Sequence, residues 1–142
     1  MVNSKASNKI NNNFRKFITS SGKLVVAGKN AEQNEQVIRQ AEANEIVLHT
    51  KSPGSPFCNI KAESKKASMK DIREAAVFCA AFSQAWKKAR KKKDIEVHAF
   101  LGKDIYKDRD MKIGTFGVKK FKKIIIKKEE IEKLEKKNLM GE

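Results

Sequence analysis

Residues 17–35 read FITSSGKLVVAGKNAEQNE, and this stretch connects two apolar runs to the start of a helix. The runs over 17–19 and 24–28 are apolar and partly β-branched, and the Ser-Ser-Gly-Lys segment between them is a hairpin turn signal. After Asn30, apolar residues recur at helical spacing, at Val37, Ile38 and Ala41. The stretch therefore predicts a β-hairpin followed directly by an amphipathic helix.

The first turn of this helix contains more polar groups than capping requires. Asn30 is a good N-cap residue, and Gln33 falls at the third helical position, as in a variant of the capping box. Capping gives no reason for Lys29 or Asn34. We therefore expect a second role here, in which the helix N-terminus and these side chains contact an anion or the edge of a base.

The remaining patterns predict an α+β fold. A polar break precedes the longest helix, which Ser68 and Asp71 are expected to cap in a box. A bulge or turn is expected after Val118, where the apolar alternation changes phase. The expected strands cover 14–19, 24–28, 45–49, 57–61, 94–101 and 115–126, the last as one or two strands, and the expected helices cover 30–42, 69–92 and 129–137.

These elements predict a single domain with a mixed or antiparallel sheet of about six strands, two main helices and a short, peripheral C-terminal helix. Residues 1–12 are expected to form a flexible polar tail, 13–128 the domain, and 129–142 a charged helix and tail. Cys58 and Cys79 lack metal or redox spacing, so we expect them to be buried, reduced thiols.

Charge is the strongest global signal. With 32 Lys and Arg against 17 Asp and Glu, the formal net charge is +15 at pH 7. Such an excess attracts polyanions, so nucleic acid is the expected partner, although a lysine-biased composition is the alternative explanation. The sequence contains no apolar run long enough for a membrane span and no signal peptide, so we expect a cytoplasmic protein without membrane contact.

A second polar stretch, HTKSPGSPF, begins at His49, where a strand ends, and it contains a tight loop. Two readings remain open for His49: a half-buried residue satisfied by the backbone, or a contact to phosphate or a stacked base together with Lys51, Gly54 and Ser55. His49 and His98 have no metal-ligand spacing with the cysteines, so no metal site is expected.

Three segments together resemble the NFACT-R family of RNA-binding domains. GKNAEQNE, residues 28–35, is similar to the family signature G-R-[ND]-x-x-Q-N, and the hairpin before it is similar to F-I-S-S-D-G-x-L. His49 and the Pro-Gly-Ser loop match the next block, and an Ala-rich helix ending in Ser-Gln-Ala-Trp at Trp86 matches a third. The similarity extends from about residue 14 to 126. Lys29 differs from the usual Arg, which favours a phosphate contact over a bidentate one, and Thr50 differs from the common Ala.

The resemblance implies RNA binding. NFACT-R is the RNA-binding part of ribosome quality-control factors, so it implies tRNA or rRNA as the ligand and the large ribosomal subunit as a further partner. The chain has no room for the other modules of those factors. We therefore expect a freestanding NFACT-R protein of the kind found in archaea and some bacteria.

Two basic runs, over 87–93 and 119–128, are expected to follow the phosphate backbone. Cations late in a helix also complement the helix dipole, which gives part of the first run a structural reason. Tyr106 is the expected stacking residue, whereas Phe82 and Trp86 are expected in the core. The expected RNA-binding residues are Lys29, Asn30, Gln33, Asn34, His49, Lys51, Gly54, Ser55, Lys87, Lys88, Arg90, Lys91, Lys119, Lys120, Lys122 and Lys123.

No arrangement of residues indicates catalysis. We find no nucleophile with a base and no phosphate-cradling loop, so the sequence predicts a protein that is not an enzyme and has no cofactor. Two alternatives remain open: a non-catalytic accessory subunit that acts through protein contacts, and a substrate-presenting partner of an RNA-modifying enzyme. The sequence leaves the oligomeric state open.

Overall fold

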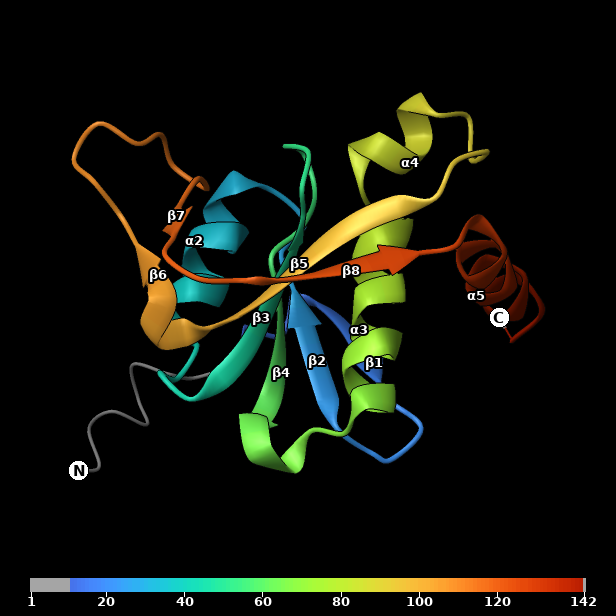
Figure 1. Cartoon of the computed structure of the whole chain (residues 1–142), viewed down its shortest axis with the longest axis horizontal. Coiled ribbons are helices and arrows are strands. Elements are labelled where there is room, and N and C mark those ends of the chain that lie inside the picture. Colours follow the sequence, from blue (N-terminus) through green and yellow to red (C-terminus); the bar gives the residue numbers. More distant parts are fainter. Residues whose placement is uncertain (1–10, 142) are drawn as a thin grey trace.

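A six-stranded antiparallel sheet forms the centre of the molecule (Figure 1). The computed structural model describes residues 11–141, so most of the expected tail lies outside the described residues. The sheet has the order β1-β2-β4-β3-β5-β8, and every neighbouring pair is antiparallel. Its strands are β1 (Arg15–Ile18), β2 (Leu24–Ala27), β3 (Glu45–Thr50), β4 (Cys58–Glu63), β5 (Ile95–Leu101) and β8 (Lys122–Ile126).

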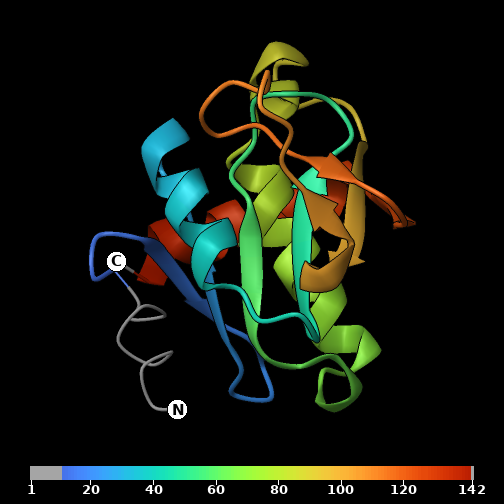
Figure 2. The ribbon, with the colours of Figure 1, turned by 90° about the vertical axis from the view of Figure 1, so that its left-hand side faces the viewer.

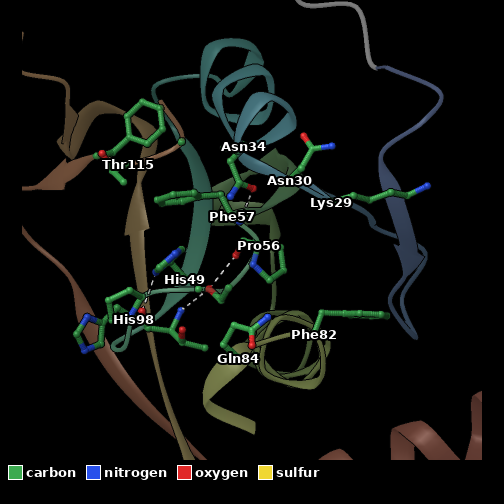
Figure 3. A pocket seen from close by; sticks show the side chains of 18 of the residues that line it. Lys29, Asn30, Asn34, His49, Pro56, Phe57, Phe82, Gln84, His98 and Thr115 are labelled. Atoms are coloured by element: carbon green, nitrogen blue, oxygen red, sulfur yellow. Dashed lines mark hydrogen bonds between the residues drawn. The ribbon is translucent and has the colours of Figure 1, made fainter. Parts of the chain in front are cut away.

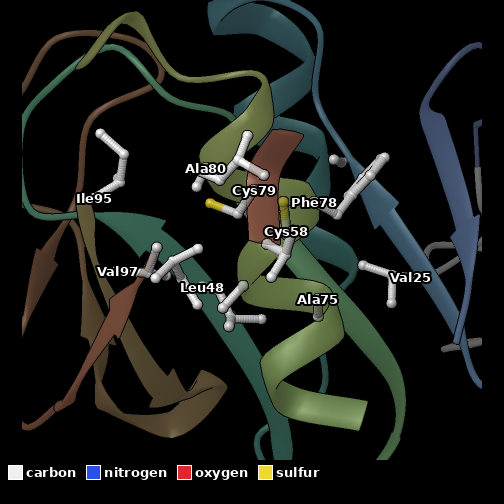
Figure 4. Packing of buried hydrophobic residues seen from close by; sticks show 14 of the residues in the cluster. Val25, Leu48, Cys58, Ala75, Phe78, Cys79, Ala80, Ile95 and Val97 are labelled. Atoms are coloured by element: carbon white, nitrogen blue, oxygen red, sulfur yellow. The ribbon is translucent and has the colours of Figure 1, made fainter. Parts of the chain in front are cut away.

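Helices cover both faces of this sheet. The first helix, α2 (Ala31–Gln40), packs on one face around Val37. The second, α3 (Met69–Ala81), packs on the other face, in a core that contains the buried free thiols of Cys58 and Cys79 (Figure 4). Figure 2, turned toward the left-hand side of Figure 1, shows α2 on the near side of the strands and α3 behind them. The α+β prediction is confirmed, with a wholly antiparallel sheet.

The expected long helix over 69–92 is wrong in one respect, because it is two helices. After α3 ends at Ala81, Ser83 accepts a hydrogen bond from Trp86 N–H at 3.2 Å and caps the short α4 (Gln84–Lys88). Arg90 and Lys91 then have positive φ angles of 56° and 60°. The basic run therefore leaves the helix after Lys88, and the helix-dipole explanation covers only its first two lysines.

The C-terminal helix is longer and less peripheral than expected. α5 (Lys128–Gly141) spans 14 residues, and its Ile131 is fully buried in the core beneath α3. Glu135 accepts a hydrogen bond from Trp86 Nε1 at 3.1 Å, and Glu130 forms a 2.7 Å ion pair with Arg73 of α3. These contacts make α5 part of the same packed unit as the sheet and α3.

The segment over 102–114, for which the sequence predicts a charged loop, contains one strand of a small second sheet. A 3₁₀ turn (Gly102–Asp104) precedes β6 (Ile105–Tyr106), which pairs with β7 (Gly117–Val118). The chain then leaves β7 and enters β8 after Phe121. The expected interruption after Val118 is therefore a break between two strands that belong to different sheets.

The predicted hairpin and the predicted capping box of α3 are both present, and they contact each other. Ser68 and Asp71 form the reciprocal box, and Ser21 in the β1–β2 turn donates a hydrogen bond to Asp71 Oδ1 at 2.7 Å. The hydrogen bonds from Ser21 and from Ser68 N–H lower the pKa of Asp71 from its ordinary 3.8 to about 2. One carboxylate thus fastens the hairpin to the start of α3.

We expect Asp71→Ala to lower the free energy of unfolding by about 1–2 kcal/mol at neutral pH, because it removes a helix cap. The pKa of Asp71 is lower in the folded chain, so its stabilisation is present above about pH 4 and is lost as the pH falls through about 2. Urea unfolding at several pH values measures this dependence. The exposed Asp110→Ala is the matched control, and a loss that does not change with pH contradicts this role.

Candidate nucleic-acid interface

The two motif segments meet in one pocket of about 640 Å³ (Figure 3). Its walls are the first turn of α2, the loop over 51–57, the start of α4 and the segment over 113–118. The side chains come from segments far apart in the sequence, and the sheet brings them together because β3, β4 and β5 are neighbours. The pocket is therefore a property of the fold and not of one motif.

The start of α2 is capped much as the sequence predicts. Asn30 Oδ1 accepts a hydrogen bond from Gln33 N–H at 2.9 Å. Gln33 Oε1 accepts from Lys29 N–H at 2.9 Å, one residue before the N-cap. Lys29 itself is exposed at the rim of the pocket, and its side chain extends away from His49 (Figure 3). Capping thus accounts for Asn30 and Gln33 and leaves the Lys29 ammonium available to a ligand.

Asn34 has a structural role that the sequence analysis missed. Its side-chain oxygen accepts a hydrogen bond from Phe57 N–H at 3.1 Å, so it joins α2 to the start of β4. Gly28 allows this approach, because a Cβ at that position would lie only 2.8 Å from the backbone nitrogen of Asn34. The bond occupies Asn34 Oδ1 and leaves the amide NH₂ group as the part of the side chain that can serve a ligand.

The loop between β3 and β4 is held by hydrogen bonds of its own. Ser55 is buried, and its hydroxyl accepts from Thr50 N–H and donates to Pro56 O, each at 3.1 Å. Gly54 has a φ of +90°, which favours glycine, and its carbonyl accepts from Gln84 N–H at 2.8 Å. Ser55 and Gly54 therefore shape the pocket wall, whereas Lys51 is exposed beside it.

Aromatic rings line the interior of the pocket. The His49 ring lies 4.2 Å from the Phe57 ring, and Phe57 meets Phe116 edge-on at 5.4 Å, measured between centroids. His49 Nδ1 lies 2.7 Å from Thr50 O. Burial lowers the pKa of His49, with the nearby His98 adding to the effect. His49 is thus a neutral ring in an apolar wall. This matches the first of the two interpretations of His49, a half-buried residue satisfied by the backbone.

Cations surround this aromatic interior. Lys29, Lys51 and Lys87 are exposed pocket residues from three different segments. Arg15 adds a fourth positive group, because its guanidinium donates to Gly28 O at 2.9 Å and lies 4.3 Å from the centroid of the Phe82 ring. Such a combination of charge and rings suits a ligand with phosphates and bases.

The structure brings about half of the expected binding residues together. The pocket contains Lys29, Asn30, Asn34, His49, Lys51, Gly54, Ser55 and Lys87. The expected residues Gln33, Lys88, Arg90, Lys91, Lys119, Lys120, Lys122 and Lys123 are not among its lining residues. Of these, all but Gln33 are exposed cations, so they form basic surface outside the pocket.

Several pocket residues were not expected, namely Arg15, Phe57, Gln84, His98 and Phe116. Phe57 and Gln84 carried a signal, since each lies in a segment that resembles a family motif. Arg15, His98 and Phe116 lie outside those segments, and tertiary packing brings them to the pocket. The ring of Tyr106, the expected stacking residue, lies against Gly117 so closely that a Cβ on Gly117 would collide with it. The Tyr106 ring therefore already covers part of β7.

Within residues 11–141, no group of three or more His, Cys, Asp or Glu side chains could hold a metal ion. Among the same residues, no helix is both long and apolar enough to cross a membrane. The lining of the pocket offers hydrogen-bonding groups, aromatic rings and positive charge.

A basic rim around an aromatic interior characterises nucleic-acid-binding modules, and comparison with known proteins agrees with that class. The model of a family described as the NFACT protein RNA-binding domain matches residues 13–120. The chain therefore belongs to the NFACT RNA-binding domain family, as the sequence resemblance indicates.

Two relatives extend this result. An archaeal Rqc2 homolog, aRqcH from Methanocaldococcus jannaschii, is 37% identical over 73 residues, which is 51% of this chain and 11% of that protein. The chain thus spans about a tenth of the length of this curated relative. The C-terminal part of the fibronectin/fibrinogen-binding protein from Streptococcus suis has the same fold, with a TM-score of 0.73, 21% identity, and 87% of this chain and 49% of that chain covered.

We expect Asn34→Ala to lower the free energy of unfolding by about 1–2 kcal/mol, because Phe57 N–H loses its acceptor in a partly buried position. Asn34→Asp keeps an oxygen at that place and should retain most of this stability. Urea unfolding compares both variants with Asn44→Ala, an exposed amide. If Asn34→Ala and Asn44→Ala are equally stable, Asn34 does not hold the loop.

Proposed function

We propose that this domain binds structured RNA, either tRNA or rRNA, mainly through phosphates, and that it acts in ribosome quality control. The observation that carries the proposal is the pocket in which both family motifs meet beneath the exposed cations Lys29, Lys51 and Lys87. The net charge of +15 supports long-range attraction of a polyanion. The similarity to an archaeal Rqc2 homolog supports the link to ribosome quality control, and the large ribosomal subunit is proposed as a further partner.

The proposed mode of binding follows from which groups have internal partners. Asn30, Gln33 and Ser55 are hydrogen bonded within the protein, so they set the shape of the pocket. Lys29 and Lys51 lie on segments that these bonds hold in place, and Lys87 lies on α4, whose start is capped by Ser83 and bound by the Gly54 carbonyl. The stems of the three lysines therefore start from fixed positions. Phosphate contacts made by such cations position an RNA, and the rings inside the pocket distinguish an unpaired base from a paired one. The domain is proposed to be a non-catalytic cytoplasmic module.

The affinity for tRNA should fall steeply as the salt concentration rises, because lysines that contact phosphates release counterions. For comparison, a protein that makes six to ten phosphate contacts with duplex DNA loses about 10³–10⁵ in affinity between about 50 and 200 mM salt. The triple variant Lys29→Glu, Lys51→Glu, Lys87→Glu should bind more weakly and with a shallower salt slope. Fluorescence anisotropy with labelled tRNA and with an rRNA fragment measures both quantities.

The matched control carries Lys133→Glu, Lys136→Glu and Lys137→Glu, three exposed lysines of α5 outside the pocket. Its net charge changes by the same amount. If both triple variants lose equal affinity, general charge drives binding and the pocket rim has no special role. If the affinity of the unaltered protein for RNA does not change with salt concentration, the phosphate-based mode of binding is contradicted.

A further inference from the structure

Phe121 is an exposed aromatic residue in one of the two basic runs of the chain. It lies directly before β8, and 51% of its surface is exposed. It stands between Lys119-Lys120 and Lys122-Lys123, all four of which are exposed. A single exposed apolar side chain is common on protein surfaces, so the contacts of the Phe121 ring and the charges around it indicate what it can do.

The ring of Phe121 is nevertheless held in one orientation. It stacks on the imidazole of His98 with a centroid distance of 4.0 Å and an interplanar angle of 13°. His98 is in turn fixed, because its Nε2 lies 2.8 Å from Glu96 Oε2. One face of the phenyl ring is covered by His98, and the 51% exposure leaves the other face open to solvent.

The stack lies beside the pocket. In the antiparallel register, His98 of β5 is opposite His49 of β3 on one side and opposite Lys123 of β8 on the other. Directly opposed residues point to the same face of a sheet, so these three side chains form a row across three strands. His98 also lines the pocket, which makes the ring pair of His98 and Phe121 continuous with the pocket wall.

The local charge favours an anionic ligand. The carboxylate of Glu96 is bound to the stack through His98 Nε2, and Lys123 Nζ lies 3.9 Å from the same oxygen. The hydrogen bond from His98, together with the positive charges of Lys123 and Lys51, lowers the pKa of Glu96, so the carboxylate is ionised and compensated by its neighbours. The other exposed lysines around Phe121 remain available for phosphates.

We propose that the open face of Phe121 stacks an unpaired nucleobase of single-stranded RNA, whose phosphates contact the flanking lysines. The inference rests on the proposed RNA-binding function and adds a second contact site, next to the pocket and one residue beyond the segment that the family model matches. A phenyl ring stacks any base, because every base has a π face, and the surrounding lysines supply the charge. The neighbouring nucleotide then lies at the pocket edge, above His98.

The test uses the full chain, a ten-nucleotide single-stranded oligoadenylate, and an RNA duplex of equal length. Phe121→Leu keeps an apolar side chain over His98 but has no π face, and Phe121→Trp enlarges that face. Base stacking on an aromatic side chain is worth about 1–3 kcal/mol, or roughly 5- to 150-fold in affinity. We expect Phe121→Leu to lose about 5- to 150-fold in affinity for the single strand. Its affinity for the duplex should fall by less than about twofold, because the bases of a duplex are already stacked. Phe121→Trp should bind the single strand at least as well as the unaltered protein does.

Ile125→Ala is the matched control, because Ile125 is 44% exposed and lies on the same strand and the same face as Lys123. We expect it to bind both RNAs normally. The salt slope of Phe121→Leu should equal that of the unaltered protein, since stacking releases no counterion, whereas Lys120→Met, at an exposed lysine next to the ring, should lower the slope by about 0.7 on a single strand.

Several outcomes overturn the inference while the proposed function stands: an unchanged Phe121→Leu, an equal loss on the duplex, or an equal loss in Ile125→Ala. A change from dimer to monomer in Phe121→Leu on size-exclusion chromatography assigns the ring to a protein interface instead. Failure of the unaltered protein to bind any of the RNAs, including tRNA, refutes the proposed function itself. Thermal unfolding confirms that each variant remains folded.

Discussion

The hydrogen bond from Phe57 N–H to Asn34 Oδ1 is the contact on which the binding surface depends. It connects the first turn of α2 to the loop that follows β3, and therefore joins the two segments that identify the family. The close approach requires Gly28, because any side chain there would meet the backbone of Asn34. With this contact made, the Phe57 ring packs against His49 and meets Phe116 edge-on, and the three rings form the interior of the pocket.

The polar residues around the pocket divide into two groups with different roles. Asn30, Gln33, Asn34 and Ser55 are hydrogen bonded within the protein, so they determine geometry. Lys29, Lys51 and Lys87 extend into solvent, and their charge is free to meet a ligand. A substitution in the first group changes the position of the second, so loss of binding alone does not show that a residue touches RNA. Stability measurements separate the two groups.

Local interactions explain what the sequence predicts well. The hairpin, the Asn30 cap and the Ser68–Asp71 box depend on residues within a few positions of one another, and all are present. The break between α3 and α4 was missed, because Ser83 is tolerated inside a helix and the Gly54 carbonyl that binds Gln84 N–H is remote in sequence. The stack of Phe121 on His98 depends on the register of β5 and β8, which alternation alone does not specify.

The position of β8 at the edge of the sheet gives its lysines a further consequence. An open edge carrying Ile125 and adjacent isoleucines is a template for pairing with a strand from another molecule, and charged side chains are a common means of preventing such pairing. Lys122 and Lys123 are both exposed on this strand. The same cations that attract a polyanion therefore also act as gatekeepers against aggregation, and neutralising them removes both properties together.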